Sequence, residues 1–326
     1  MCYLQLIGGL LLLILGGNYL VESSSDIARK LKMSTLVIGM TIVAFGTSLP
    51  ELLVSIRAAL SGHSDMALGN VLGSNIVNIG FIGGMTALLV PFFVSVKSIK
   101  VDSLIMLVFS VFLFAACMDN LISRMEGIVV FILLLAYIIG SLVDSKRKGV
   151  KEIYEEPNRS LVINILILVF SFISLFYGSD MLVNGASEIA LHWGIEERVI
   201  SLIVVAIGTS LPELAASIAS VVKKEIGITI GNILGSNIFN VGAVIGLSSA
   251  ISPISVSFES FKVDLIWFVS FAVLLIIGMI NLKRNIVNVG ETGHLSELWS
   301  CEYGVVGRIW GALTVIVYFI YVCLLF

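Results

Sequence analysis

Long apolar stretches separated by short polar segments dominate the chain. Two of these stretches, ending at residues 50 and 212, continue past a single glutamate to residues 56 and 222. A transmembrane helix needs about 20 apolar residues, whereas the strands of a membrane barrel alternate in segments of about 10 residues. The pattern therefore predicts an all-α integral membrane protein with ten transmembrane helices. The ten windows without a charged residue are 1–21, 33–50, 66–96, 103–118, 127–143, 160–179, 199–212, 226–258, 265–282 and 309–326.

The composition agrees with a membrane protein. Hydrophobic residues make up 58% of the 326 positions and charged residues 13%, against about 25% charged residues in soluble domains. The first window has no basic start and no small-residue cleavage site, so we interpret it as a retained helix rather than a signal peptide. The cysteines form no CxxC or other metal-ligand spacing, and we interpret them as small apolar packing residues. They are Cys2, Cys117, Cys301 and Cys323.

The basic residues are distributed unevenly between the two sides of the predicted membrane. With the N-terminus outside, the inner loops carry 15 of the 19 Lys and Arg residues, and the outer side keeps only Arg57, Arg124, Arg198 and Lys262. The positive-inside rule then predicts a multi-pass protein of the cell membrane with both termini outside. The lipid bilayer is the partner this implies. The net charge of −3 indicates neither nucleic acid nor a protein partner.

The hexapeptide GTSLPE occurs twice, at residues 46–51 and 208–213. The offset of 162 between the copies also aligns residues 16–28 with 178–190, and it holds without a gap to Pro91 and Pro253. Because five helices precede the second copy, that copy enters the membrane in the opposite orientation. Inverted repeats with a midplane site between them are typical of secondary transporters. We predict a first five-helix repeat at 1–144, a short charged cytoplasmic linker at 145–158 and a second repeat at 159–326.

Polar residues recur at helical spacing within each copy. Positions i, i+3 and i+7 of the second helix, and positions i, i+4 and i+8 of the third, share one helix face. We expect the four polar faces of the two copies to meet at one shared centre. The first copy contributes Ser48, Glu51, Ser55, Asn70, Ser74 and Asn78, and the second contributes Ser210, Glu213, Ser217, Asn232, Ser236 and Asn240.

A proline lies directly before each glutamate. Pro50 has no N–H, so the carbonyl of Gly46 loses its helical partner and the turn opens. Freed carbonyls in hydrocarbon need a partner, and a cation can be that partner. A glutamate within a membrane span costs a few kcal/mol and usually marks an ion or proton path. Two carboxylates with amide, hydroxyl and carbonyl oxygens suit hard cations such as Ca²⁺ or Na⁺.

Other motif residues have simpler interpretations. The three histidines fall in predicted loops, which argues against a zinc or copper site. The GxxxG spacings predict close helix packing, and the two asparagines off the polar faces are interpreted as packing residues as well. The glycines are Gly69, Gly73, Gly231 and Gly235, the asparagines Asn75 and Asn237, and the histidines His63, His192 and His294.

These motifs make the chain similar to the compact prokaryotic type of the sodium/calcium exchanger family, within the cation/calcium antiporter superfamily. The family's two alpha-repeats resemble "AFGTSLPELLVS" with "GNVLGSNIVNIG" and "AIGTSLPELAAS" with "GNILGSNIFNVG", which lie within about 33–91 and 195–253. The resemblance implies a Ca²⁺ site between Glu51 and Glu213, completed by the backbone carbonyls of Thr47 and Thr209. It places Asn78 and Asn240 at the middle of the site, and flanking Na⁺ positions at Ala44, Ser48 and Ser74 and at Ala206, Ser210 and Ser236.

The resemblance implies an antiporter that exchanges Na⁺ for Ca²⁺ by alternating access. It implies electrogenic Ca²⁺ extrusion, no permanently bound cofactor and no enzymatic activity. Potassium-dependent relatives need an acid at the position of Asn240, which argues against K⁺ co-transport. A Ca²⁺/H⁺ exchanger using the same glutamates remains an alternative.

Two other classes of protein fit less well. An intramembrane hydrolase would need a membrane-embedded His or Lys to activate a serine, and it has no use for a duplicated site. A channel is disfavoured because fixed carboxylates in broken helices favour tight, alternating occupancy over conduction.

Overall fold

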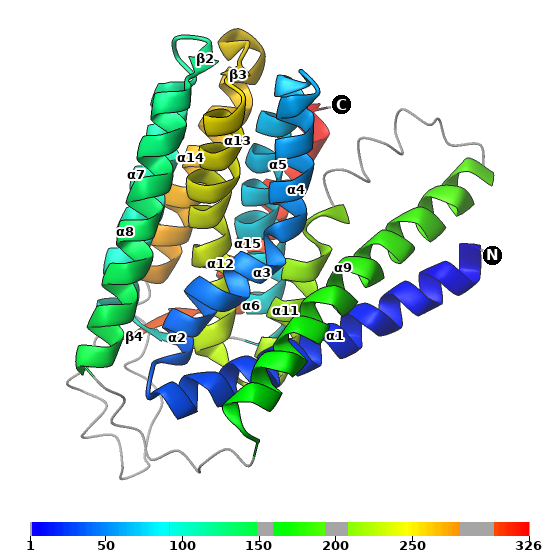
Figure 1. The fold of residues 1–326 in the computed structure, drawn as a ribbon, viewed down its shortest axis with the longest axis vertical. Helices are drawn as coiled ribbons and strands as arrows, with labels where there is room; N and C mark the ends of the chain where they lie inside the picture. Colours follow the sequence, from blue (N-terminus) through cyan, green and yellow to red (C-terminus); the bar gives the residue numbers. More distant parts are fainter. Residues whose placement is uncertain (1, 91, 149–158, 193–207, 281–302, 326) are drawn as a thin grey trace.

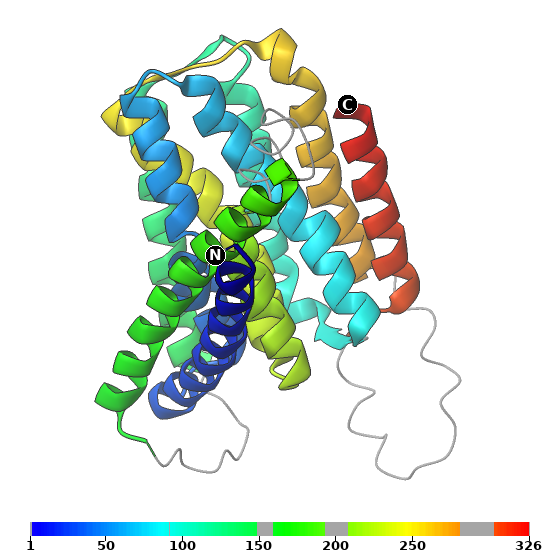
Figure 2. The same ribbon diagram turned by 90° about the vertical axis from the view of Figure 1, so that its right-hand side faces the viewer.

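Helices arranged side by side form almost the whole structure (Figure 1). The computed structural model describes residues 2–90, 92–148, 159–192, 208–280 and 303–325. Helices α1 (Cys2–Leu31) and α9 (Leu161–His192) lie against each other and cross the remaining helices diagonally (Figures 1 and 2). Small residues permit this approach, because a Cβ on Gly9 would lie 2.7 Å from the carbonyl oxygen of Gly178.

The second predicted helix is broken at its proline. It comprises α2 (Thr35–Ile38), a π-helical segment η1 (Gly39–Val43), α3 (Ala44–Thr47) and α4 (Leu49–Leu60). The helix bends by 46° between α3 and α4, and Ser48 between them has φ −84° and ψ 6°. Pro50 is the second residue of α4, where a missing N–H removes no helical hydrogen bond. The break expected from the proline is confirmed in this copy.

The second copy has the same arrangement at its proline. Helix α11 (Leu211–Val222) carries Pro212 at its second position and follows Ser210, which has φ −87° and ψ 2°. These angles match those of Ser48 within a few degrees. The predicted span before this point falls on residues 193–207, which lie outside the described residues.

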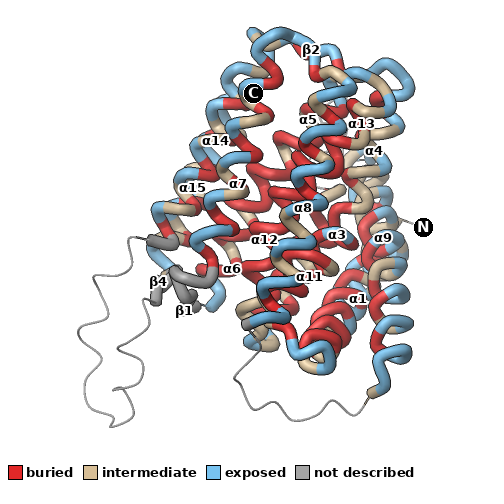
Figure 3. Tube along the Cα trace, turned by 60° about the vertical axis from the view of Figure 1, so that its left-hand side comes forward, coloured by how far each residue is buried: buried red, intermediate tan, exposed pale blue. Residues whose placement is uncertain are grey.

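Two interrupted helices occupy the centre of the bundle. One runs through α5 (Ser64–Ile76), η2 (Val77–Gly83) and α6 (Gly84–Leu89), and the other through α12 (Ile226–Phe239), η3 (Asn240–Ile245) and α13 (Gly246–Ile251). Figure 3 shows α12 surrounded by buried chain, and every residue of α12 from Ile228 to Phe239 is buried. The hydropathy pattern does not predict these π-helical interruptions. Single π-helical turns inside α-helices are rare and often occur at functional sites.

The outer helices present apolar side chains outward, as a membrane environment requires. Helix α7 packs against α14, α8 against α13, and α15 against α6. Met125 and Phe170 are each 68% exposed, which fits contact with lipid rather than water. The bounds of these helices are α7 Val96–Ala116, α8 Arg124–Lys148, α14 Phe258–Ile280 and α15 Arg308–Leu325.

Seven single helices of the described residues are long and apolar enough to cross a membrane, and the bent pair α2–α4 would make an eighth span. Helices α11 and α15 are shorter apolar helices of the same region. The chain is therefore a multi-pass helical membrane protein. The count of ten helices and the division into two repeats remain predictions.

Two short antiparallel strand pairs were not expected. Strand β1 (Phe92–Ser95) pairs with β4 (Tyr303–Val306), and β2 (Leu121–Ile122) pairs with β3 (Ile254–Ser255). The charge-free window 66–96 is helical only as far as Leu89 before the first strand begins. Val90 is extended, with φ −138° and ψ 108°, because a residue before proline is pushed away from helical angles.

The close packing predicted at the GxxxG spacings is confirmed in the second copy. A Cβ on Gly235 would lie 2.7 Å from the carbonyl oxygen of Met40, and one on Gly231 would lie 2.9 Å from Cα of Gly39. In the first copy, a Cβ on Gly69 would lie 3.8 Å from the ring of Phe261. The positions equivalent to Met40 and Ala44 are 202 and 206, which lie outside the described residues, so close packing at Gly73 stays a prediction.

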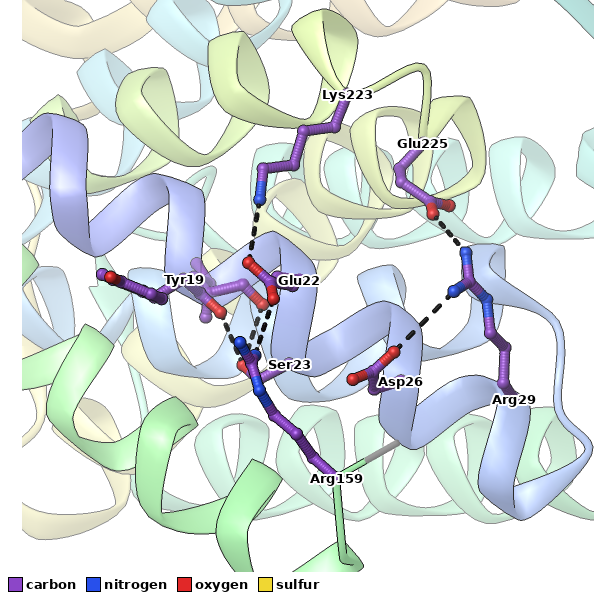
Figure 4. Close-up of polar contacts among 9 residues, drawn as sticks. Tyr19, Glu22, Ser23, Asp26, Arg29, Arg159, Lys223 and Glu225 are labelled. Atoms are coloured by element: carbon purple, nitrogen blue, oxygen red, sulfur yellow. Dashed lines mark hydrogen bonds and ion pairs between the residues drawn. The ribbon is translucent and has the colours of Figure 1, made fainter. Parts of the chain in front are cut away.

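Ion pairs hold one end of α1 in place (Figure 4). Glu22 lies 2.7 Å from Arg159, just before α9, and 3.3 Å from Lys223, at the turn between α11 and α12. Arg29 lies 3.0 Å from Glu225 in the same turn. The three basic side chains of these pairs, Arg29, Arg159 and Lys223, belong to the set predicted for the inner side of the membrane. The pairs join α1 to both α9 and the α11–α12 turn.

Candidate functional site

Two buried carboxylates lie at the two helix breaks. Glu51 is 0% exposed and Glu213 is 1% exposed. Each lies in the first turn of its helix, α4 or α11, where the helix dipole stabilises negative charge. Ser48, three residues before Glu51, is hydrogen-bonded to Glu213, so the two acids lie in the same part of the bundle. A pair of acids inside an apolar bundle is unfavourable unless something compensates the charge.

Each carboxylate accepts a hydrogen bond from a serine. The hydroxyl of Ser48, at the first break, donates to Oε1 of Glu213 at 3.1 Å, and the hydroxyl of Ser74 on α5 donates to Oε1 of Glu51 at 3.5 Å. The Ser48 contact brings residues from the two copies together. The second carboxylate oxygen, Oε2, of both glutamates is buried and has no hydrogen-bond partner among the described residues.

Asn70, on α5, connects the first carboxylate helix to the second copy. Its Nδ2 donates to the backbone carbonyl of Glu51 at 3.3 Å and to the hydroxyl of Ser55 at 2.9 Å. Its Oδ1 accepts from the hydroxyl of Thr209 at 3.3 Å. The Asn70 side chain therefore makes three hydrogen bonds, all of them to other protein atoms.

Asn232, on α12, makes the same set of contacts in the second copy. Its Nδ2 donates to the carbonyl of Glu213 at 3.4 Å and to Ser217 at 3.1 Å, and its Oδ1 accepts from Thr47 at 3.2 Å. Every partner is the residue 162 positions from its equivalent in the first set. The four polar faces expected to meet at one centre do meet there.

The other predicted amides are less completely bonded. Both polar atoms of the Asn78 side chain are buried without a partner among the described residues, and the same holds for Oδ1 of Asn240. Nδ2 of Asn240 donates to Oδ1 of Asn75 at 3.4 Å. Asn75, interpreted from its sequence position as a packing residue, thus contacts the cluster. The signal that could have identified it is its place directly after Ser74 in a GSN motif, which the second copy repeats with Ser236 and Asn237.

The remaining predicted residues are placed as follows. Ser210 and Ser236 are buried, and neither hydroxyl has a partner in the described part of the chain. Ala44 is buried, and its carbonyl accepts from the backbone N–H of Ser48 at 3.0 Å. Thr209 is half-buried at the second break, whereas Ala206 lies outside the described residues.

The cluster has the chemistry of a site for a hard cation. Buried polar groups without a hydrogen bond are rare and cost about 1–3 kcal/mol each, so several together indicate an absent partner. Most of the unpartnered atoms are carboxylate, amide and hydroxyl oxygens, which bind Ca²⁺ and Na⁺ in preference to softer metals. No group of three or more His, Cys, Asp or Glu side chains occurs in the described ranges. The charge facing an ion is therefore that of two carboxylates.

Comparison with known sequences points to transporters. The chain is 40% identical over 253 residues to the putative antiporter CaxA of Alkalimonas amylolytica, and the alignment covers 75% of this chain and 79% of that protein. It is 32% identical over 296 residues to the sodium/calcium exchanger MaX1 of Methanosarcina acetivorans, covering 78% and 84%. It is 38% identical over 257 residues to the inner membrane protein YrbG of Escherichia coli, covering 76% and 79%.

Comparison with solved structures agrees. The chain superposes on the sodium-calcium exchanger NCX_Mj soaked with Na⁺ and Ca²⁺ with a TM-score of 0.81 and 30% identity, over 99% of this chain and 97% of that one. The sodium/calcium exchanger protein family matches residues 1–143 and 163–326, which include both carboxylate helices. The chain belongs to the sodium/calcium exchanger family.

Proposed function

We propose that the protein exchanges Na⁺ for Ca²⁺ across the cell membrane by alternating access, as an electrogenic Ca²⁺ extruder. The observation that carries the proposal is the cluster of buried oxygens around Glu51 and Glu213, several of them without a partner among the described residues. Relatives named as antiporters and exchangers support ion exchange over channel or enzyme activity. Ca²⁺ and Na⁺ are substrates in this proposal, and no resident cofactor is needed.

The proposed Ca²⁺ position lies between the two carboxylates. Glu51 and Glu213 supply the charge, and the backbone carbonyls of Thr47 and Thr209 complete the coordination. The proposed Na⁺ positions use the flanking residues, and the two central amides lie between them. These residues are Ala44, Ser48, Ser74 and Asn78 in the first copy and Ala206, Ser210, Ser236 and Asn240 in the second.

The proposed architecture is two inverted five-helix repeats, 1–144 and 159–326, joined by the linker 145–158, with both termini outside. The recurrence of site contacts at an offset of 162 supports a duplication. Single cysteines at Lys148 and His192, in a background without the native cysteines, should react from opposite sides of the membrane, Lys148 from inside. Reaction of both from one side would overturn the helix count and the inverted arrangement.

The function is tested by ⁴⁵Ca²⁺ uptake into proteoliposomes. An outward Na⁺ gradient without a pH gradient should drive uptake, and an equal K⁺ gradient should not. A Glu51→Gln/Glu213→Gln protein in the same liposomes provides the background. Uptake driven by a proton gradient and indifferent to Na⁺ would replace the proposal with Ca²⁺/H⁺ exchange.

A further inference from the structure

The buried asparagines of the two motifs divide into two classes. Asn78 and Asn240 have side-chain oxygens without a partner among the described residues, as an ion ligand would in the absence of its ion. Asn70 and Asn232 are equally buried but use both Nδ2 hydrogens and their Oδ1 in contacts with protein atoms. This difference separates residues available to an ion from residues committed to the protein.

The chemistry of the partners fixes the orientation of these amides. Nδ2 of Asn70 faces the backbone carbonyl of Glu51, which can only accept a hydrogen bond, so the NH₂ group and not the oxygen must point there. Oδ1 consequently faces the hydroxyl of Thr209, which donates. The same reasoning applies to Asn232, with Glu213 and Thr47 as its partners.

Each asparagine joins the two copies at the ion site. Asn70 links the carbonyl of Glu51, in its own copy, to Thr209 at the break of the other copy. Asn232 links Glu213 to Thr47 in the reverse sense. These bonds are present in both copies. By contrast, the serine contacts to the carboxylates occur once each, because the hydroxyls of Ser210 and Ser236 are not bonded in the described part of the chain.

We propose that Asn70 and Asn232 are positioning residues that set the geometry of the ion site across the two copies without binding an ion themselves. Each holds a carboxylate helix and the threonine of the opposite break at a fixed separation. The threonine carbonyls and the carboxylates then face the same point. This inference rests on the proposed ion site, and it assigns to the first asparagine of each GN motif a role distinct from that of Asn78 and Asn240.

A double-mutant cycle on Ca²⁺ affinity tests the pairing. Thr209→Val, which removes the bond to Asn70, should weaken ⁴⁵Ca²⁺ binding to the purified full-length protein by about fivefold to tenfold, and Asn70→Ala, which removes three hydrogen bonds, by at least as much. Because the two residues share a bond, the double variant should bind at least about threefold more tightly than independent effects predict. The matched control combines Asn70→Ala with Thr47→Val, which do not bond each other, and its effects should multiply.

Asn70→Asp separates positioning from direct ion binding. Aspartate keeps the oxygen and adds charge but removes the NH₂ donors. If Asn70 is a positioning residue, this variant should bind Ca²⁺ more weakly than the wild-type protein. If Asn70 is an ion ligand, the variant should bind Ca²⁺ equally or more tightly. Melting temperatures of all variants are measured in the same detergent.

Three results would overturn the inference: tighter binding by Asn70→Asp, equal coupling of Asn70 to both threonines, or a lowered melting temperature with an unchanged Ca²⁺ dissociation constant. Failure of the wild-type protein to bind Ca²⁺ would instead refute the proposed function.

Discussion

The number of ionised groups at the site determines which half of the transport cycle responds to membrane potential. Among the described residues, Glu51 and Glu213 are the only buried acids of the cluster. The other buried acid in that part of the chain, Asp102, accepts a hydrogen bond from Tyr137 on α8. With both glutamates ionised, one Ca²⁺ makes the loaded site neutral and three Na⁺ give it a charge of +1. Substitution Asn240→Asp would lower both values by one.

The structure can accommodate this substitution. Asn240 now donates to Oδ1 of Asn75, and Nδ2 of Asn75 has no partner among the described residues. Rotating the Asn75 amide would present that NH₂ group to an aspartate at position 240, so a hydrogen bond replaces the one lost. We therefore expect Asn240→Asp to fold and to differ from the wild-type protein mainly in charge.

The expected magnitude follows from the charge that moves. One elementary charge crossing 100 mV changes the free energy by about 2.3 kcal/mol, which is a factor of about 50 in an equilibrium ratio. If the barrier lies midway across the field, the corresponding rate changes about sevenfold. Ca²⁺/Ca²⁺ exchange by the wild-type protein moves a neutral complex and should not respond. The same exchange by Asn240→Asp moves a charge of −1 and should respond.

The assay uses proteoliposomes clamped with valinomycin at different K⁺ ratios. ⁴⁵Ca²⁺ uptake is measured against internal Ca²⁺ without Na⁺, and separately against internal Na⁺, where the wild-type protein should depend on potential. Asn240→Ala is the matched control, because it loses the contact with Asn75 without adding charge. Potential-dependent Ca²⁺/Ca²⁺ exchange by the wild-type protein, or potential-independent Na⁺/Ca²⁺ exchange, would refute the charge assignment.

Three further predictions concern the same centre. Glu51→Gln and Glu213→Gln should each reduce Na⁺-driven ⁴⁵Ca²⁺ uptake to near background while the protein still elutes as a single folded species, because each removes half of the charge facing the ion; near-normal uptake would contradict the site. Gly235→Ala should destabilise the protein by about 1–3 kcal/mol, since its Cβ would meet Met40. An unchanged unfolding midpoint would disprove this close contact. Lowering the pH from 8 to 5 should slow exchange, because protons compete with Ca²⁺ for the two carboxylates. The measurement is the initial rate of exchange without a pH gradient. A rate that does not change with pH would show that the carboxylates are not exposed, empty ligands during the cycle.

Features set by a short run of residues could be predicted from the sequence. The breaks follow from Pro50 and Pro212, whose missing N–H interrupts a helix regardless of its neighbours. The meeting of polar faces follows from helical spacing together with the unfavourable burial of isolated polar groups in hydrocarbon. In the first copy, these local rules predicted that Asn70 and Ser74 would lie next to Glu51. They did not predict that Ser48 would contact Glu213 instead.

Features that depend on contacts between distant segments could not be predicted. Asn70 bonds Thr209, which lies just before α11, and Asn75 bonds Asn240, the first residue of η3. Both bonds join segments more than 130 residues apart. The π-helical turns could not be predicted either, because no residue type within them requires the wider turn. The strand pairs join segments more than 130 residues apart.

The two copies share their residues at the proposed ion site but not at their ends. Glu22 and Arg29 form ion pairs with Lys223 and Glu225, but the positions 162 residues away hold Asn184, Leu191, Ser61 and His63. The charges that join α1 to the α11–α12 turn therefore have no counterpart joining α9 to the α4–α5 turn. Side chains that are 21–39% exposed contribute at most about 1 kcal/mol per pair. In the proposed alternating-access cycle, this difference would make opening one end of the bundle require a different free energy from opening the other.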